Sequence, residues 1–232
     1  MIPPEETPER RASLDRAQVL QAGIALADRA GFGALSMRAL ATELGVVPMA
    51  LYKHVSDKDD LVGGMIDTLV EGYVAPPESA SWQAAVRAQI LEARRTLIAH
   101  RWLRTAIESR TRRTPAVLAY MNSLAGRFIT GGLSVDLTHH AMHALGHRIW
   151  GFSPEAFDEP VPAAGPPDPE TLRRAAETYP YIVAIVADTA ARPSGACDEG
   201  FEFEFTLDLL LDAFARLHES GWASQPASPP AT

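Results

Sequence analysis

Three adjacent hydrogen-bonding side chains, Tyr52, Lys53 and His54, are the first feature of this sequence that could do chemistry. A phenol, an ammonium group and an imidazole all donate hydrogen bonds, so together they suit the phosphates and base edges of a nucleic acid. The residues just before them are small or apolar, namely Val47, Pro48, Met49 and Ala50. Such residues let a helix backbone come close to the bases in a major groove. The stretch therefore predicts a nucleic-acid contact.

A second group is a histidine stripe. His139, His143, His147 and Trp150 recur at spacings of four, four and three, with His140 beside them. Two histidines four residues apart on a helix can share a zinc ion, but the catalytic zinc motif also needs a glutamate beside the first histidine, which is absent here. Three interpretations stay open: histidines at a dimer seam or in the core, the polar lining of a ligand cavity, and a metal site.

The cavity interpretation places an effector among the helices expected between residues 81 and 150. No Gly-rich phosphate loop, paired-carboxylate site or nucleophile elbow is present, so we assign no catalytic residue, no metal ligand and no cofactor. The candidate ligand-binding residues are His100, Trp102, Leu103, Tyr120, Phe128, His139, Met142, His143, His147 and Trp150.

Two short helices must position the first group of side chains. Ser36 suits the N-cap of a helix over residues 37–44, Gly45 ends it, and Pro48 suits the first turn of a second helix over 48–55. These proportions are typical of a helix-turn-helix, whose second helix enters the major groove of DNA. In that arrangement Leu51 and Val55 face the core, which leaves Tyr52, Lys53 and His54 free to reach outward.

The rest of the chain also favours helices. Ser13 suits the cap of a first helix that ends near Gly31, and the Ser56–Asp59 stretch fits a capping box for a fourth. The alternating FEFEF stretch at 201–205 is typical of a strand, but it has no strand to pair with and continues into helical spacing, so helix is preferred. Further helices are expected from Ser81, from Thr114, and over 134–150, 168–179, 180–191 and 199–219.

Charge is unevenly distributed. The chain has 232 residues and a net charge of −8, yet residues 10–58 contain seven Lys/Arg against four Asp/Glu. Local charge rather than the total governs attraction to a polyanion, so this segment is compatible with DNA. Cys197 is the only cysteine, which excludes a disulfide within the chain. The sequence shows neither a membrane-spanning run nor an apolar signal-peptide core, so a cytoplasmic protein is expected.

The stretches LSMRALATELGV and ALYKHVSDKDDL resemble the TetR family of transcriptional regulators over residues 14–61. The resemblance implies that Ser36 and Arg38 contact the backbone or a base edge, and that Tyr52, His54 and Lys58 bind phosphate. It implies that base readout involves Lys53 and the residues Val47, Pro48, Met49 and Ala50. The family often has polar residues at the start of this helix, so the apolar ones here point to contact with thymine methyl groups.

The segments RRTLIAHRW and GLSVDLTHHAMHALGHRIWGF look like the C-terminal domain of the tetracycline-repressor subgroup. The residues with which that subgroup binds its drug and its magnesium ion are not found at the corresponding positions of this sequence. Val74 stands where its drug-contacting histidine would fall, and Ile107 where its magnesium-binding histidine would fall. Glu155, near the place of a carboxylate that reaches the metal through water, consequently lacks a partner. Tetracycline-magnesium is therefore not the expected effector.

Together these features predict an all-α homodimer that represses transcription from a palindromic operator on double-stranded DNA and is released by a small-molecule effector. The alternative is a helical metal-binding protein or enzyme that uses His139, His143 and His147, and a helical protein–protein adaptor is a third possibility. The expected organisation is a flexible arm (1–12), a helix-turn-helix domain (13–60), a ligand-binding and dimerisation domain (61–221) and a disordered tail (222–232).

Overall fold

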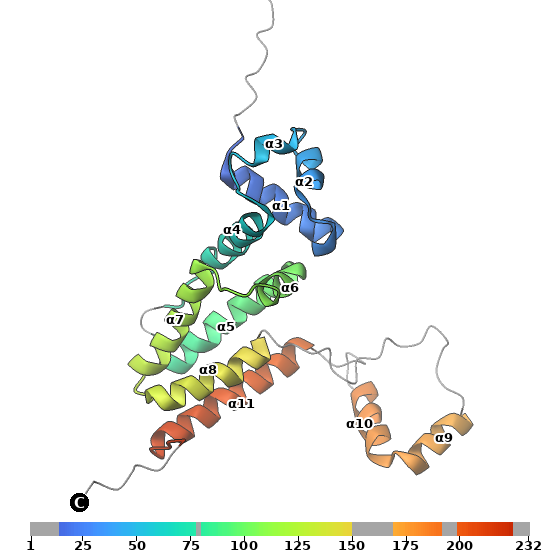
Figure 1. The fold of residues 1–232 in the computed structure, drawn as a ribbon. Helices are drawn as coiled ribbons and strands as arrows, with labels where there is room; N and C mark the ends of the chain where they lie inside the picture. Colours follow the sequence, from blue (N-terminus) through green and yellow to red (C-terminus); the bar gives the residue numbers. More distant parts are fainter. Residues whose placement is uncertain (1–13, 78–79, 150–168, 192–198, 225–232) are drawn as a thin grey trace, which may run out of the picture. The chain divides into compact units, whose positions relative to one another are not determined.

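The computed structural model describes residues 14–77, 80–149, 169–191 and 199–224. Within these ranges every regular element is a helix (Figure 1), so the expected all-α fold class is confirmed. By its internal contacts the chain divides into two units, residues 1–131 and 132–232.

The first unit carries the helix-turn-helix and the helices that follow it. Its described elements are α1 (Arg16–Ala30), the 3-10 helix η1 (Phe32–Ala34), α2 (Met37–Glu43), α3 (Pro48–Leu51), α4 (Lys58–Glu71), α5 (Trp82–Ala99), α6 (Trp102–Glu108) and α7 (Pro115–Thr130).

The second unit combines two long helices with a helical hairpin. Its described elements are α8 (Val135–Ile149), α9 (Pro169–Thr178), α10 (Pro180–Ala191) and α11 (Glu199–Glu219). The FEFEF stretch lies inside α11, as expected. Helices α8 and α11 contact each other and bury apolar residues, and α9 and α10 contact each other. The buried apolar side chains of the long pair are Leu137, Ala141, Leu145, Phe203, Leu207, Leu211 and Phe214.

The helix caps agree with the sequence at three positions and differ at two. Ser36, Ser81 and Thr114 each accept a hydrogen bond from a backbone N–H in the first turn of the following helix, as expected. The cap of α1 is Asp15, because its side chain and that of Gln18 exchange hydrogen bonds with each other's backbone N–H. Ser13 lies outside the described residues. The cap of α4 is Asp57, whose carboxylate accepts from the Asp60 N–H at 2.8 Å.

One helix is shorter than the sequence predicts, and one helix was not predicted as a separate element. The helix expected over 48–55 is α-helical only to Leu51, and the chain then turns, with His54 N–H donating to the Leu51 carbonyl at 2.8 Å. The helix that begins after Ser81 ends at Ala99, because His100 leaves the helical conformation, with φ −120° and ψ 74°. Helix α6 begins two residues later and was not predicted as a separate element.

The core of the first unit places α4 between the N-terminal helices and the later ones. Helix α4 contacts α1 on one side and α7 on the other, and its Leu61, Met65 and Ile66 are fully buried. Gly64 permits the close crossing with α1, since a Cβ atom there would lie 2.7 Å from a methyl carbon of Leu20. The internal contacts divide the chain after Gly131, whereas the sequence predicts a boundary between the helix-turn-helix domain and the following domain at residue 60. That boundary stays a prediction.

The ends of the chain are only partly described. The expected arm, residues 1–12, lies outside the described residues, as does Glu155. Of the expected tail, residues 225–232 also lie outside. Its first residues contact α8: Ser224 donates two hydrogen bonds to the Asp136 carboxylate, at 2.7 and 2.8 Å, and the Trp222 ring lies 5.5 Å from that of His140.

Candidate functional site

The turn between α2 and α3 fixes the angle of the short helix that carries the candidate base-contacting residues. Val46 N–H donates to the Ala41 carbonyl at 3.0 Å, and Gly45 N–H donates to the Thr42 carbonyl at 3.2 Å. This pair of bonds is a Schellman motif, which needs a left-handed residue at the position of Gly45, and Gly45 has φ +65°. Glycine is the residue that takes this conformation with least strain.

Helix α3 and the turn after it have one buried face and one exposed face. Leu51 and Val55 are almost completely buried, as expected, with exposures of 0% and 1%. On the other face Val47 and Met49 are 68% and 71% exposed, and Tyr52 is 46% exposed. Pro48 and Lys53 are also exposed, while Ala50 and His54 are half-buried.

Three further candidate residues lie on the neighbouring elements. The Ser36 hydroxyl accepts from the Ala39 N–H at 3.1 Å, so it caps α2, and Arg38 on α2 is exposed. Lys58 is the first residue of α4 and places its ammonium group 5.7 Å from the centroid of the Phe32 ring. All three residues belong to the same unit as α3.

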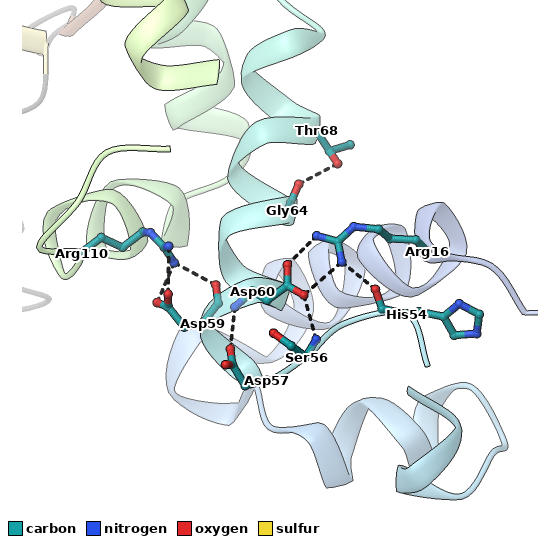
Figure 2. Close-up of polar contacts among 9 residues, drawn as sticks. All are labelled: Arg16, His54, Ser56, Asp57, Asp59, Asp60, Gly64, Thr68 and Arg110. Atoms are coloured by element: carbon teal, nitrogen blue, oxygen red, sulfur yellow. Dashed lines mark hydrogen bonds and ion pairs between the residues drawn. The ribbon is translucent and has the colours of Figure 1, made fainter. Parts of the chain in front are cut away.

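An ion pair with α1 supports the turn after α3 (Figure 2). One Arg16 nitrogen donates to the His54 carbonyl at 2.6 Å and the other to an Asp60 oxygen at 2.6 Å. The second oxygen of Asp60 accepts from the Ser56 N–H at 2.8 Å. The hydrogen bond from Arg16 is the main reason that the pKa of Asp60 falls to about 2. Sequence reasoning missed this ion pair, because its partners are 44 residues apart and no local spacing signals it.

Helix α6 is attached to α1 and to α4. On α1, Asp28 accepts from the Trp102 indole N–H at 2.7 Å, and its carboxylate lies 2.8 Å from Nδ1 of His100. The Trp102 ring also stacks on Phe32, with centroids 6.2 Å apart. After α6, Arg110 donates to both oxygens of the Asp59 carboxylate at the start of α4 (Figure 2), at 2.7 and 3.0 Å.

A hollow of about 400 Å³ lies between the end of α4, α5 and α7. Tyr120 is the one candidate ligand-binding residue of the first unit that lines it, while His100 and Trp102 bind Asp28 instead. Leu103 and Phe128 are fully buried core residues. The lining residues are Val70, Glu71, Tyr73, Val74, Ala75, Pro76, Gln89, Pro115, Ala116, Ala119, Tyr120, Ser123 and Arg127.

Two aromatic rings and one amide of this lining lie close together. Tyr73 and Tyr120 meet edge to face with ring centroids 5.5 Å apart. The Tyr120 hydroxyl donates to the Gln89 carbonyl at 3.4 Å, and the Gln89 amide donates to the Tyr120 carbonyl at 3.5 Å. Burial raises the pKa of Tyr73 to about 12 and also raises the pKa of Tyr120, so both phenols are neutral at physiological pH.

The described part of the histidine stripe lies on the surface of the second unit. His139 and His143 are exposed, with ring centroids 4.6 Å apart, and Met142 is half-buried. The side chain of His147 and all of Trp150 lie outside the described residues. Among the residues that the structure describes, no three His, Cys, Asp or Glu side chains are grouped so that they could hold a metal ion. Nor is any described helix both long and apolar enough to cross a membrane.

Two family models match the chain. Residues 19–65 match the model of the bacterial regulatory proteins of the tetR family, and residues 75–216 match the tetracyclin repressor-like, C-terminal domain. An HTH-type transcriptional regulator of Saccharopolyspora erythraea is 34% identical over 117 residues, which are 50% of this chain and 50% of that protein. The chain spans about half the length of the curated relatives that it matches first.

Solved structures show the same fold. A possible TetR family transcriptional regulator from Streptomyces coelicolor A3(2) has a TM-score of 0.68 and 27% identity, over 88% of this chain and 100% of that one. The Streptomyces coelicolor TetR family protein ActR in complex with (S)-DNPA has a TM-score of 0.65 and 25% identity, over 88% and 98%. Because the second family model covers more than half of the residues and the first covers the helix-turn-helix, this chain belongs to the TetR family of bacterial regulatory proteins.

Proposed function

We propose that this chain is a homodimeric transcriptional repressor that binds a palindromic DNA operator and leaves it when a small-molecule effector binds. The observation that carries the proposal is the two-faced α3 segment: Leu51 and Val55 anchor it, while Val47, Met49 and Tyr52 are exposed. Exposed large apolar residues on a short, fixed helix suit contact with base methyl groups in a major groove.

Each candidate residue has a role in this proposal. Tyr52, His54 and Lys58 bind phosphates and set the position of the protein on the duplex. Lys53 reaches a base edge, and Val47, Pro48, Met49 and Ala50 read thymine methyl groups. Ser36 and Arg38, on α2, contact the backbone or a base edge. The site of action is the cytoplasm, where bacterial DNA lies.

Two copies are needed because one short helix makes too few base contacts to select an operator. Two recognition helices about one DNA turn apart read a palindrome. An exposed apolar stripe on α11 supports dimerisation: Phe201, Phe205 and Leu209 recur every four residues and are 59%, 51% and 52% exposed. We propose this stripe, with α8, as the seam between the two copies.

Helix α4 and helix α6 connect the effector hollow to the DNA-binding surface. Helix α4 carries Lys58 at its first turn and Glu71, which lines the hollow, at its last. Trp102 at the start of α6 binds Asp28 on α1, and Arg110, two residues after the end of α6, binds Asp59 at the start of α4. A ligand that moves the end of α4 therefore moves the DNA-binding helices too. A coupling of about 1–3 kcal/mol suffices to change occupancy about 5–150-fold. The complex of ActR with (S)-DNPA supports a ligand-binding role for this fold.

A gel-shift titration tests the proposal. The purified protein is titrated against labelled DNA from the region upstream of its own gene, with unrelated DNA of the same length as the control. We expect retardation of the upstream fragment at lower protein concentration, weakening as salt rises because counterions are released. Equal affinity for both fragments, or none for either, would refute the proposal.

A further inference from the structure

The hollow between α4, α5 and α7 has a mainly apolar lining with a few polar groups. Pro76, Pro115, Ala116 and Ala119 contribute flat or small apolar surfaces, and Tyr73 and Tyr120 contribute aromatic rings. Its volume of about 400 Å³ is at the lower end of the range for small-molecule pockets. Flat apolar surfaces beside aromatic rings favour a planar aromatic body, because rings stack on or meet the edges of other rings.

Two polar atoms of the lining residues have no hydrogen-bond partner. The Tyr73 hydroxyl and the Gln89 side-chain oxygen are both buried, and neither has a partner among the described residues. Gln89 is held in place by its amide, which donates to the Tyr120 carbonyl. An unpaired buried polar atom costs free energy, and a ligand that supplies the missing partner recovers it. Tyr73 can donate and the Gln89 oxygen can accept, so the complementary ligand carries both an acceptor and a donor.

The two charged residues of the lining differ in their exposure. Arg127 on α7 is half-buried, whereas Glu71 at the end of α4 is exposed to solvent. Neither side chain is in an ion pair with another described residue. A partly buried charge gains more from a counter-ion than a fully hydrated one, since water no longer solvates it completely. The hollow therefore favours an anion next to Arg127 over a cation next to Glu71.

We propose that the effector is a planar aromatic anion, such as an aromatic carboxylate, with a hydroxyl or amide group beside the ring. Its ring lies against Tyr73 and Tyr120 and its anionic group pairs with Arg127. Its polar substituent reaches the Tyr73 hydroxyl and the Gln89 oxygen when the side chains that cover these two atoms in the free protein move aside. This proposal rests on the proposed function in one respect only, namely that binding of the ligand changes the affinity for DNA. Binding itself is measurable without DNA.

A matched pair of probes tests the ligand class. Calorimetric titration of the protein with 3-hydroxy-2-naphthoate is compared with titration by the neutral compound 2-naphthol, which has the same ring system without the carboxylate. We expect the carboxylate to bind at least about ten-fold more tightly, because charge-assisted hydrogen bonds are stronger than neutral ones. Equal binding of the two probes, tighter binding of 2-naphthol, or no binding of either would overturn the proposal.

Variants then locate the site. Arg127→Gln should reduce the preference for the carboxylate to within about two-fold, whereas Glu71→Gln, which also removes one charge from the lining, should preserve or increase it. Tyr73→Phe should weaken carboxylate binding while leaving the melting temperature of the free protein unchanged or higher, since the lost hydroxyl has no partner there. An unchanged preference in Arg127→Gln, or unchanged affinity in Tyr73→Phe, would contradict the site.

The same probes separate this proposal from the proposed function. Tight, Arg127-dependent binding of the carboxylate supports the ligand class even if the gel-shift titration shows no specific DNA binding, which refutes only the repressor role. Specific DNA binding without carboxylate binding refutes the ligand class and leaves the repressor role intact.

Discussion

At the scale of single residues, the surface that we propose to face DNA consists of exposed side chains that lie between buried apolar ones. Leu51 and Val55 are buried, and between them Tyr52 and Lys53 are exposed. Removing the exposed pair therefore removes contacts with a partner and leaves the core intact. Function and stability can be separated by substitution at these positions.

The double variant Tyr52→Ala/Lys53→Ala should bind the operator less tightly and show a shallower dependence of affinity on salt. The salt slope should fall by about one unit, because one cation no longer displaces counterions. Gel-shift titrations at several salt concentrations measure both quantities. Arg95→Ala on α5 is the control, since it also removes one exposed charge. A double variant that binds like the control would place the DNA elsewhere.

The Arg16–Asp60 ion pair gives a second prediction at this scale, concerning pH. The pKa of Asp60 is lowered from 3.8 to about 2 in the folded state. Its stabilising contribution is therefore fully present above about pH 4 and is lost as the pH falls through about 2. Asp60→Asn should flatten the decrease in unfolding free energy between pH 4 and 2, by less than about 1 kcal/mol because the pair is partly exposed.

Urea denaturation at a series of pH values measures this effect. Glu219→Gln, which removes an exposed carboxyl group at the end of α11, is the matched control and should keep the slope of the wild type. If Asp60→Asn and wild type lose the same unfolding free energy between pH 4 and 2, the ion pair does not contribute to acid sensitivity.

At the scale of elements, the angle between α2 and α3 depends on one left-handed residue. Gly45→Ala should lower the unfolding free energy by about 1–2 kcal/mol, because a Cβ atom at φ +65° meets the neighbouring carbonyl. Gly45→Asn should lower it less, since asparagine tolerates this conformation. Urea denaturation measures both variants. No atom outside the turn lies within 4 Å of the added Cβ, so a steric clash is not expected to contribute. Equal losses in the two variants would contradict backbone strain as the cause.

The junction between α1 and α6 gives the second prediction at this scale. Asp28→Ala leaves the donors of His100 and Trp102 without their acceptor, so the unfolding free energy should fall by about 1–3 kcal/mol. If α6 transmits the effector signal, the probe carboxylate should also release DNA from this variant less effectively. Asp28→Asn keeps one acceptor oxygen and should show a smaller effect on both measurements. Identical behaviour of Asp28→Ala and wild type would exclude this junction from the coupling.

At the scale of the whole molecule, the first unit contains both the surface that we propose to face DNA and the hollow that we propose to bind the effector. Helix α4 belongs to both, and its buried residues contact α1 and α7. The second unit supplies the exposed apolar stripe of α11 that we assign to the dimer seam. Effector binding and dimerisation should therefore be separable by substitution.

Leu209→Glu should convert the dimer into monomers, because it places a charge in the apolar seam, and should abolish specific DNA binding while leaving carboxylate binding intact. Light scattering after size exclusion measures the mass of the particle. Ile98→Glu on α5 replaces a side chain of similar exposure, 54% against 52%, outside the seam and should remain dimeric. A Leu209→Glu variant that stays dimeric would assign the seam to another surface.

Local signals in the sequence were sufficient for most of the fold. The caps Ser36, Ser81 and Thr114, the proline at the start of α3 and the helical spacing through the FEFEF stretch all act within four residues, so they are visible without a structure. The cap of α1 was placed at Ser13 instead of Asp15, because deciding between neighbouring caps requires the reciprocal bonds with Gln18. The break at His100 that separates α6 likewise has no glycine or proline to signal it.

What the sequence determined by itself is the set of short helices that hold the residues proposed to face DNA, because apolar spacing and capping are properties of adjacent residues. What only the tertiary structure decided is which distant side chains meet. His100 and Trp102 were expected in a ligand cavity and instead bind Asp28, more than 70 residues away. The hollow beside Tyr73 and Gln89 likewise forms where α4, α5 and α7 come together. Such contacts depend on how helices cross, and the spacing of residues along one helix carries no information about the neighbour it will meet.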